Sequence, residues 1–342
     1  MSKIERRTRT LEWSPGEPIA FQELVEAGEP VILKGYAREW PLVQAGLRSA
    51  DEAMTYLASY AIDNPLTCFV GDTAMAGLFA YNQDVTAFNF HSEQIPVKTF
   101  FDRVKEQAGS GGDHLYIGST TLERYFPSMR EENDLDLTDP TLQENPPLVS
   151  IWMGNHTIAS AHYDLANNIA CCAVGRRRFT LFPPGQVANL YPGPLEPTPG
   201  GQVISMVDFN RPDFERYPDF AKALESAQVA ELEAGDVLVY PSMWWHHVEG
   251  LDDFNVLINY WWNPTPDHMD TPQNTLLHAL LALRERPDYE KQAWRELFDY
   301  YVFGDPERPR AHLPEHAQGP LGPMDETTAR RLRARLMSKL NR

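Results

Sequence analysis

The sequence has few cysteines and no long apolar run. Three cysteines among 342 residues cannot form a disulfide framework, and Cys171 and Cys172 are direct neighbours. This cysteine content is typical of a reducing compartment. No segment approaches the roughly 20 apolar residues that span a bilayer, and Met1–Arg7 lacks the apolar core of a signal peptide. We therefore expect a cytoplasmic protein without a membrane partner.

The sequence also lacks the basic excess of proteins that bind nucleic acid. It has 30 Lys and Arg against 48 Asp and Glu, which gives a formal net charge of −18 and a pI of about 4.9. Such a charge repels a phosphate backbone, so we expect no nucleic-acid partner. Apolar residues make up 42% of the chain, and eight tryptophans are present. This content is sufficient for the large core of a globular protein.

Three regions follow one another without an internal repeat. Residues 1–113 mix short strands and helices and are expected to flank a core. Residues 114–265 contain short β-rich runs separated by turn residues, a pattern typical of an antiparallel jelly roll. Residues 266–342 have helical periodicity. We predict a mainly β protein with flanking helices, a double-stranded β-helix (jelly-roll) core and a helical C-terminal region.

Apolar runs and turn residues place the individual elements. Helices are predicted at residues 50–60 and 97–107. An insert rich in Pro and Gly, from residue 192 to about 231, interrupts the strands. The strands that we predict lie at residues 30–35, 148–153, 168–174, 177–182, 237–240 and 255–262.

The C-terminal helices carry wide apolar faces. The first contains Leu276, Leu277 and Leu281, and the second contains Trp294 and Leu297 at helical spacing. Such faces are suited to covering the barrel or to pairing with a second copy of the chain. We hypothesise a homodimer formed through these helices.

His-x-Asp at a strand end is one half of a common iron site. In the 2-His-1-carboxylate arrangement, three protein ligands bind Fe(II) and leave three positions open. The spacing itself is a weak signal, because His162-Tyr163-Asp164 and His268-Met269-Asp270 both have it and His91-Ser92-Glu93 is a variant. Only His162 lies between two apolar strands. We therefore predict His162 and Asp164 as two metal ligands.

The third ligand must come from a strand that is distant in sequence. Residues 235–247 are a turn, an apolar strand and a proline break that carries His246 and His247. Taken alone, this segment leaves two interpretations equally open. One is a metal ligand, and the other is a hydrogen-bonded core histidine beside a surface histidine.

Several motifs in a fixed order now resemble those of the cupin-like JmjC dioxygenases. The resemblance covers roughly residues 20–265 and is especially close to the asparaginyl hydroxylase that acts on the hypoxia-inducible factor. The matching motifs are His162-Tyr163-Asp164, Leu181-Phe182-Pro183-Pro184, Leu190-Tyr191-Pro192, Val207-Asp208-Phe209, Trp244-Trp245-His246-His247 and Asn259-Tyr260-Trp261.

The resemblance implies a metal site and an activity. The first histidine of the pair, His246, would be the third ligand beside His162 and Asp164. The implied cofactors are Fe(II), 2-oxoglutarate as cosubstrate and O₂. The implied reaction is hydroxylation of a C–H bond in a protein side chain or a small molecule, with release of succinate and CO₂.

The resemblance also implies a pocket for the cosubstrate. Arg177 stands where relatives have a lysine for the far carboxylate of 2-oxoglutarate. Strand alternation places Arg177 on the face opposite Arg176 and Arg178. The other implied pocket residues are Tyr116, Asn168 and Asn259, and Trp261 is expected on the substrate side.

Two departures from the family pattern keep other functions open. A threonine three residues before the first ligand is Ala159 here, and an Arg-Gln pair that grips peptide in the asparaginyl hydroxylase is Val203-Ile204. One alternative is a metal-dependent cupin enzyme that does not use 2-oxoglutarate. Another is a JmjC-like protein that binds a partner without catalysis. The sequence does not identify the substrate.

Overall fold

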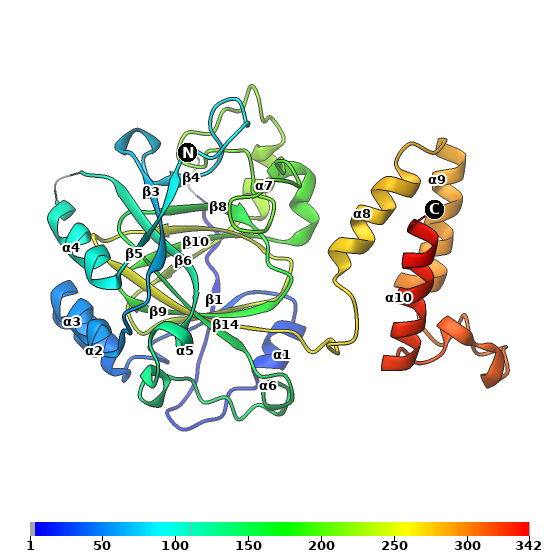
Figure 1. Cartoon of the computed structure of the whole chain (residues 1–342), viewed down its shortest axis with the longest axis horizontal. Helices are drawn as coiled ribbons and strands as arrows, with labels where there is room; N and C mark the ends of the chain where they lie inside the picture. The colour runs from blue at the N-terminus through cyan, green and yellow to red at the C-terminus, as the bar shows by residue number, and fades with distance from the viewer. Residues whose placement is uncertain (1–3, 110, 342) are drawn as a thin grey trace. The chain divides into compact units, whose positions relative to one another are not determined.

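The computed structural model describes residues 4–109 and 111–341. It divides into two compact units, Met1–Asn263 and Pro264–Arg342 (Figure 1). Residues 1–113 belong to the same unit as residues 114–263, and the second unit begins two residues before the expected helical region. No helix among the described residues is long and apolar enough to cross a membrane.

In the part of the first unit that the structure describes, fourteen strands form two sheets. The nine-stranded sheet has the order β1-β2-β12-β9-β14-β7-β6-β3-β5, and the five-stranded sheet has the order β11-β10-β13-β8-β4. The strand bounds are β1 Arg9–Leu11, β2 Val31–Leu33, β3 Leu66–Gly71, β4 Leu78–Phe79, β5 His91–Ile95, β6 His114–Thr121, β7 Leu148–Gly154, β8 Ile158–His162, β9 Asn167–Val174, β10 Arg177–Phe182, β11 Gln228–Leu232, β12 Val237–Tyr240, β13 Trp245–Gly250 and β14 Asn255–Trp262.

Among the described residues, seven α-helices belong to the first unit and three to the second. Helix α3 begins at an N-cap, in which the Ser49 side chain accepts from the Glu52 amide. The helix bounds are α1 Phe21–Glu26, α2 Pro41–Arg48, α3 Ala50–Tyr60, α4 Val97–Gln107, α5 Leu122–Tyr125, α6 Pro140–Glu144, α7 Phe220–Ser226, α8 Pro272–Leu283, α9 Asp288–Phe298 and α10 Glu326–Leu340.

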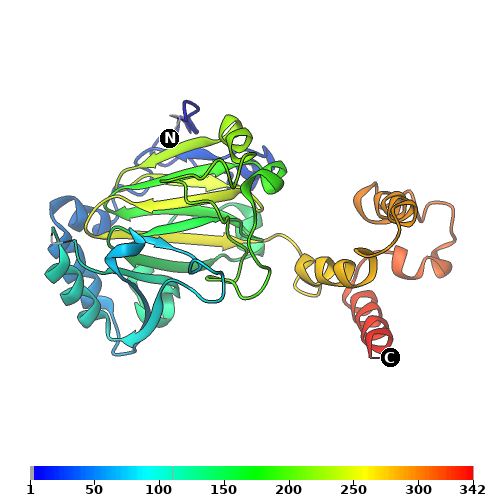
Figure 2. The same ribbon diagram turned by 90° about the horizontal axis from the view of Figure 1, so that it is seen from above.

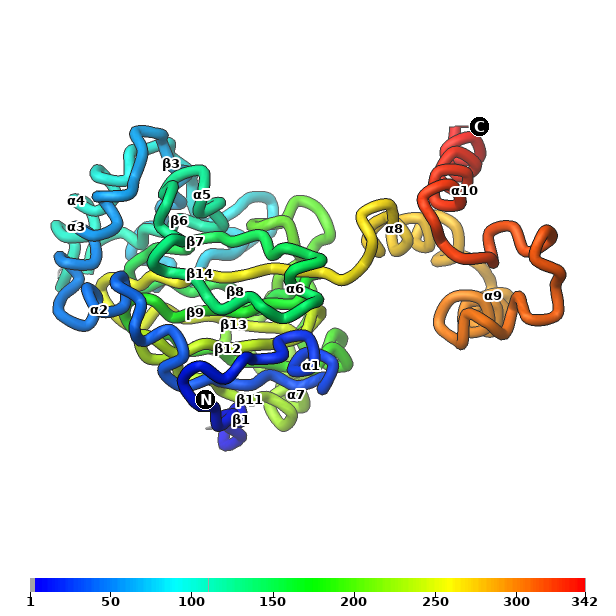
Figure 3. Tube along the Cα trace, turned by 90° about the horizontal axis from the view of Figure 1, so that it is seen from below, coloured from blue at the N-terminus to red at the C-terminus, as the bar shows by residue number. Residues whose placement is uncertain are grey.

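The strands of the large sheet run side by side, mostly antiparallel (Figure 3). The parallel pairs are β1 with β2 and, in the small sheet, β4 with β8. The two sheets lie face to face as a double-stranded β-helix (Figure 2). The predicted jelly-roll fold is confirmed.

Alternation along the strands separates the core into layers. In β9, Cys171 and its same-face neighbours pack with the N-terminal helices, whereas Ala170 and Cys172 face the small sheet. Every residue of β9 is buried, as expected for a central strand covered on both faces. Figure 1 shows α2, α3 and α4 gathered along this outer side. The space between the sheets is therefore an apolar interior protected from solvent. A polar side chain in it is an exception that calls for a structural or functional reason.

Most predicted elements have the predicted bounds, and one region differs. Helices α3 and α4 and strands β10, β12 and β14 match the predictions, and β9 begins one residue earlier. The supposed insert at 192–231 is only partly irregular, because it contains α7 and most of β11. Phe220 and Leu224 of α7 pack with Phe182 and Phe209 on the outer face of the small sheet. The many prolines and glycines of this region predicted a loop, so these apolar contacts were not expected from the sequence.

The second unit buries very little of its own apolar surface. Pro309 and Ala329 are its only buried residues among those described, and α8 and α9 have none. Leu281 on α8 is 78% exposed, and Phe303, after α9, is 76% exposed. A unit of this size that covers so few of its apolar side chains lacks a core of its own.

Candidate metal centre

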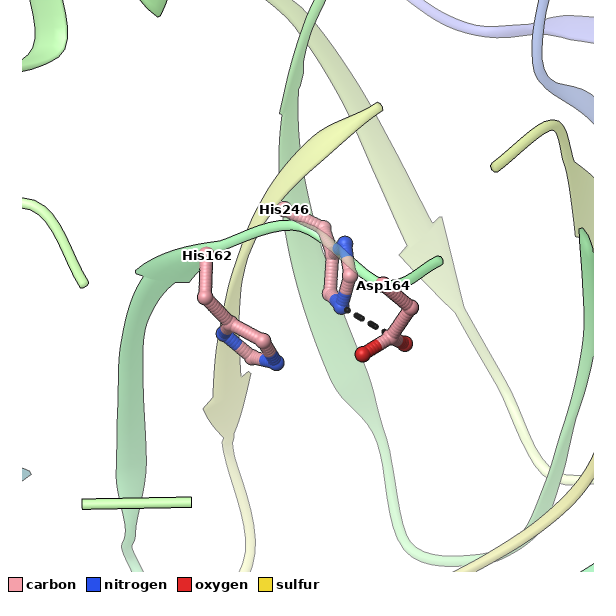
Figure 4. Close-up of side chains that lie close together, drawn as sticks. All are labelled: His162, Asp164 and His246. Carbon is pink, nitrogen blue, oxygen red and sulfur yellow. Dashed lines mark ion pairs between the residues drawn. The ribbon is translucent and has the colours of Figure 1, made fainter. Parts of the chain in front are cut away.

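Two histidines and one aspartate converge between the sheets. His162 ends β8, Asp164 follows two residues later, and His246 lies on β13, the neighbouring strand. One ligand atom from each residue lies within 4.8 Å of the other two. The His246 Nε2 to Asp164 Oδ2 distance is 3.6 Å, and the imidazole centroids are 4.3 Å apart. Figure 4 shows the three side chains directed toward one another. This arrangement forms a His-Asp-His triad able to hold a metal ion.

A β-bulge aims His162 into the interior. His162 pairs with His246, but Ala159 pairs with Val248, so β8 has one residue more than β13 over this stretch. The additional residue lets both Ala159 and His162 face the space between the sheets. Without the bulge, strict alternation would direct one of these two side chains to the opposite face.

Both histidines are held in the tautomer that a metal requires. The Nδ1 atom of His162 lies 2.8 Å from the carbonyl of Ser160, and that of His246 lies 3.0 Å from the carbonyl of Trp244. A carbonyl oxygen accepts only, so each Nδ1 carries the proton. The Nε2 lone pair is then free to bind a metal.

Asp164 is positioned by two side chains and one amide. Trp261 donates from Nε1 to Asp164 Oδ2 at 3.2 Å, and Asn168 donates from Nδ2 to the same oxygen at 3.4 Å. The Met243 amide donates to the Asp164 carbonyl at 2.8 Å, and Met243 has a left-handed φ of 66°. A non-glycine residue in this region is strained. The strain lies beside a candidate ligand.

The two predicted asparagines form one polar chain behind Asp164. Asn259 donates to Asn168 Oδ1 at 3.3 Å, and Asn168 donates to the Tyr240 hydroxyl at 2.7 Å. Asn259 in turn accepts from the Trp152 indole at 2.7 Å. Both asparagines are buried and both have partners. The structure therefore places them next to the triad, where they orient Asp164 as outer-shell groups do in metal sites.

Arg177 is a buried cation without an anion. Its side chain faces the interior with Phe179 and Leu181, whereas Arg176 is exposed and pairs with Asp252. Arg177 is only 3% exposed, and neither its Nε nor its Nη2 has a hydrogen-bond partner. Burial lowers the pKa of this guanidinium. An unpaired charge in this setting is costly, so the site is suited to an anionic ligand.

Tyr116 is close enough to both Arg177 and Asp164 for each charge to act on its phenol. Its ring is 6.1 Å from that of Trp152. Burial raises the pKa of Tyr116 to about 12, the charge of Arg177 lowers it, and the charge of Asp164 raises it. Its phenol is therefore a neutral hydrogen-bond donor at pH 7, close to both charged groups.

The paired histidines face opposite sides of β13, as alternation predicts. Burial, and then the neighbouring His162, lower the pKa of His246 to about 4. His247 points to the outer face and stacks on Phe209 at 4.4 Å. Burial lowers its pKa to about 3. Both imidazoles are therefore neutral at pH 7, and only His246 belongs to the triad.

The other motifs of similar spacing do not form such a site. His91 lies on β5 and contacts Glu93 at 3.0 Å on the surface, and His268 contacts the Met324 carbonyl. Within residues 4–109 and 111–341, the triad is the only group of three or more His, Cys, Asp or Glu residues that meets metal-binding geometry. The interior thiol of Cys172 contacts the Gly175 carbonyl instead.

Sequence reasoning missed two interior aromatic residues. Tyr240 contacts Asn168 and lies 5.0 Å from His246 between ring centroids. Trp152 contacts Asn259 and lies 5.7 Å from Trp261 between ring centroids. Tyr240 shares the parity of Leu238, and Trp152 that of Ser150, so alternation was the signal that placed both in the interior.

Comparison with known proteins agrees with this architecture. Residues 18–268 match the family described as "Cupin-like domain". The chain belongs to this cupin-like family. Its predicted membership of the JmjC group is confirmed as well, whereas the closer resemblance to the asparaginyl hydroxylase stays a prediction.

Three relatives of the cupin-like chain show the range of the group. Lysine-specific demethylase JMJ31 of Arabidopsis thaliana is 33% identical over 163 residues, which is 43% of this chain and 29% of the relative. tRNA wybutosine-synthesizing protein 5 of Gallus gallus is 28% identical over 292 residues, 76% of this chain and 83% of the relative. HSPB1-associated protein 1 of Homo sapiens is 34% identical over 195 residues, which is 53% of this chain and 39% of the relative. This chain thus spans well under half of two of these relatives.

Proposed function

We propose that this cupin-like protein is an Fe(II)- and 2-oxoglutarate-dependent oxygenase that hydroxylates a C–H bond of a protein side chain or a small molecule. One observation carries the proposal: the triad and the unpaired guanidinium of Arg177 share one interior. The triad would hold the iron, and Arg177 would hold an acid that chelates it. Bound iron and 2-oxoglutarate would supply the oxidation by O₂, with succinate and CO₂ as by-products.

The residues of the triad fit the metal by their chemistry. Two neutral imidazoles and one carboxylate are the donor set that leaves positions open on non-haem iron. The carbonyls of Ser160 and Trp244 fix both imidazoles, and Trp261 and Asn168 fix the carboxylate. All of these contacts come from the chain itself, and they would orient the three donors toward a metal.

The residues around Arg177 fit a dicarboxylate. A guanidinium binds a carboxylate through two parallel hydrogen bonds, and both Nε and Nη2 are available for them. Tyr116 would add a neutral donor to the same carboxylate. The anion would neutralise the charge that is otherwise buried without a partner, which favours binding of the acid over an empty pocket.

The direct test is succinate formation by the purified protein. With Fe(II), O₂ and 2-oxoglutarate, we expect succinate in the wild type and in His247→Ala, and none in His246→Ala. His247 is the matched control because its ring stacks on Phe209 on the other face of β13. Iron binding without succinate would instead support a cupin enzyme that does not use 2-oxoglutarate. Failure to retain iron would support a non-catalytic binding protein.

We also propose that a second copy of the chain covers the helical unit. Residues 264–342 contain 12 basic and 12 acidic residues, so the whole formal charge of −18 belongs to residues 1–263. Two copies repel each other least where they are neutral. The neutral unit also has most of the exposed large apolar side chains, Leu281 and Phe303 among them. A homodimer through these helices would bury them. The first unit would bind the substrate, which is a protein or a small molecule.

A further inference from the structure

Tyr240 is a buried phenol whose own proton has no acceptor. Its hydroxyl oxygen accepts from Nδ2 of Asn168 at 2.7 Å, and the residue is only 3% exposed. Within the described part of the chain, this contact is the single hydrogen bond of the hydroxyl, and it leaves the O–H donor free. A buried donor without an acceptor is costly, so we expect the missing acceptor on a ligand.

The hydroxyl of Tyr240 lies beside the triad. Asn168 donates from the same Nδ2 to Asp164 Oδ2 at 3.4 Å, so one nitrogen contacts both the phenol and the candidate metal ligand. The Tyr240 ring centroid lies 5.0 Å from that of His246. Burial, and then the charge of Asp164, raise the pKa of Tyr240 well above its ordinary value, so the phenol keeps its proton. A permanent neutral donor is therefore placed next to the positions that the triad leaves open on a metal.

Strand β10 connects the buried arginine to the triad. Its inward-facing residues are Arg177, Phe179 and Leu181, and Leu181 is paired with His246 on β13. An acid that is held by Arg177 and also reaches the triad must extend along this row. The Tyr240 ring lies 6.3 Å from that of Phe179, between centroids, and it also contacts His246. Its hydroxyl is therefore placed at the end of the acid that meets the metal.

We propose that the Tyr240 hydroxyl donates a hydrogen bond to the carboxylate beside the keto group of a chelating 2-oxoacid, and so selects acids that have this group. The inference rests on the proposed function, in which Arg177 and Tyr116 hold the far carboxylate. Each end of the acid would then have its own donor. A carboxylate bound to a metal dication needs no further positive charge, and a neutral phenol fixes its orientation.

Two small acids separate the two ends of the cosubstrate. Pyruvate has the 2-oxoacid group without the far carboxylate, and butyrate has the far carboxylate without the 2-oxoacid group. Their affinities for the Fe(II) protein are measured under nitrogen by calorimetry, in competition with 2-oxoglutarate. We expect Tyr240→Phe to weaken 2-oxoglutarate and pyruvate about 10- to 100-fold, as for loss of a hydrogen bond to a charged group, and to leave butyrate unchanged. Arg177→Ala should weaken 2-oxoglutarate and butyrate and leave pyruvate unchanged.

Tyr260→Phe is the matched control for the loss of a buried hydroxyl. Tyr260 is fully buried on β14, and its hydroxyl donates to Asp134 on the opposite face of the large sheet. It should leave all three affinities unchanged. Infrared spectra of 2-oxoglutarate labelled with ¹³C at the chelating carboxylate give a readout of the hydrogen bond itself. Loss of the bond raises the antisymmetric stretching frequency of the carboxylate, so we expect an upward shift in Tyr240→Phe and none in Tyr260→Phe.

The possible results separate this inference from the proposed function. If 2-oxoglutarate binds the wild type and Tyr240→Phe with the same affinity and carboxylate frequency, the role of Tyr240 is wrong and the oxygenase proposal stands. If Tyr240→Phe weakens all three acids alike, Tyr240 has a structural role and the inference is again wrong. If the wild type binds none of the acids, both proposals fail.

Discussion

The two units of this chain use apolar residues in opposite ways. The first unit buries its apolar side chains in three clusters and keeps a few polar groups between them. Among the described residues, the second unit buries only Pro309 and Ala329 and exposes fourteen large apolar residues. The first carries all the net charge, and the second carries none. We infer that the first unit is built around a site and the second around a partner.

Polar groups are informative about function in the first unit and uninformative in the second. Between the sheets, an imidazole or guanidinium without a partner is costly and indicates a missing ligand. Arg177 is such a group. On the helical unit, charged residues such as Arg330 and Glu326 pair within one helix in water, which contributes little. The informative feature there is apolar exposure. The predictions below test whether the two units are as separable as this contrast implies.

The largest effect is expected from loss of a triad ligand. His246→Ala removes one of three donors, and outer-shell changes alone cost 10- to 100-fold in metal affinity, so we expect a loss of more than about 100-fold. Iron affinity is measured by equilibrium dialysis under nitrogen. His247→Ala is the matched control, because its ring stacks on Phe209 on the other face. Equal losses in the two variants would contradict the assignment of the ligand.

Arg177 should matter for the cosubstrate and not for the metal. Loss of one partner of a buried charged pair costs about 2–5 kcal/mol, so Arg177→Ala should weaken 2-oxoglutarate binding at least about 30-fold. Calorimetric titration measures this, with Arg178→Ala as the control. Arg177→Met should also raise the unfolding temperature of the ligand-free protein, because it removes an uncompensated charge. A lower unfolding temperature in Arg177→Met would mean that the guanidinium has a structural partner.

The outer contacts of Asp164 should have a smaller effect. Asn168→Ala removes a donor to Asp164 and one to Tyr240. We expect iron affinity to fall by about 10- to 100-fold, as for other outer-shell contacts. Asn255→Ala, at a buried asparagine that contacts Asp252 and Asn155, is the control for a lost buried amide. A similar loss of iron in both variants would indicate general destabilisation.

The helical unit should set the assembly state without affecting the site. Leu281→Glu places a charge on a face that a second copy would cover. We expect sedimentation to show a dimer for the wild type and a monomer for this variant, with unchanged iron affinity. Leu47→Glu, at an exposed leucine of the first unit, should remain a dimer. A wild type that sediments as a monomer would refute the proposed pairing.

Acid should destabilise the first unit over a defined pH window. In the unfolded chain both histidines have pKa values near 6.5, but the folded values are about 4 for His246 and about 3 for His247. Between pH 4 and 6.5 the unfolded state binds more protons, so the free energy of unfolding rises with pH across this window. Denaturant titration of the metal-free protein measures this slope. His247→Phe should reduce the slope, and an unchanged slope in this variant would contradict the assignment.

Strand alternation made much of the site predictable from the sequence. It placed Arg177 inward between Arg176 and Arg178, and it separated His246 from His247. It did not place the β-bulge in β8, because a bulge depends on how two strands pair and not on one strand alone. The hydrogen bonds from Trp261 and Asn168 to Asp164 depend on three strands meeting, and they were not predictable either. Helix α7 was not predicted, because its apolar partners lie on strands that are distant from it in sequence.

The central claim is that the triad and Arg177 together hold iron and a chelating 2-oxoacid. Anaerobic titration of the Fe(II) protein with 2-oxoglutarate tests it directly, because chelation of Fe(II) by the oxoacid produces a visible charge-transfer band. We predict a band that saturates at one oxoacid per chain, weakens in Arg177→Ala and is absent in His246→Ala. No band in the wild type, or a band that Arg177→Ala leaves unchanged, would contradict the account.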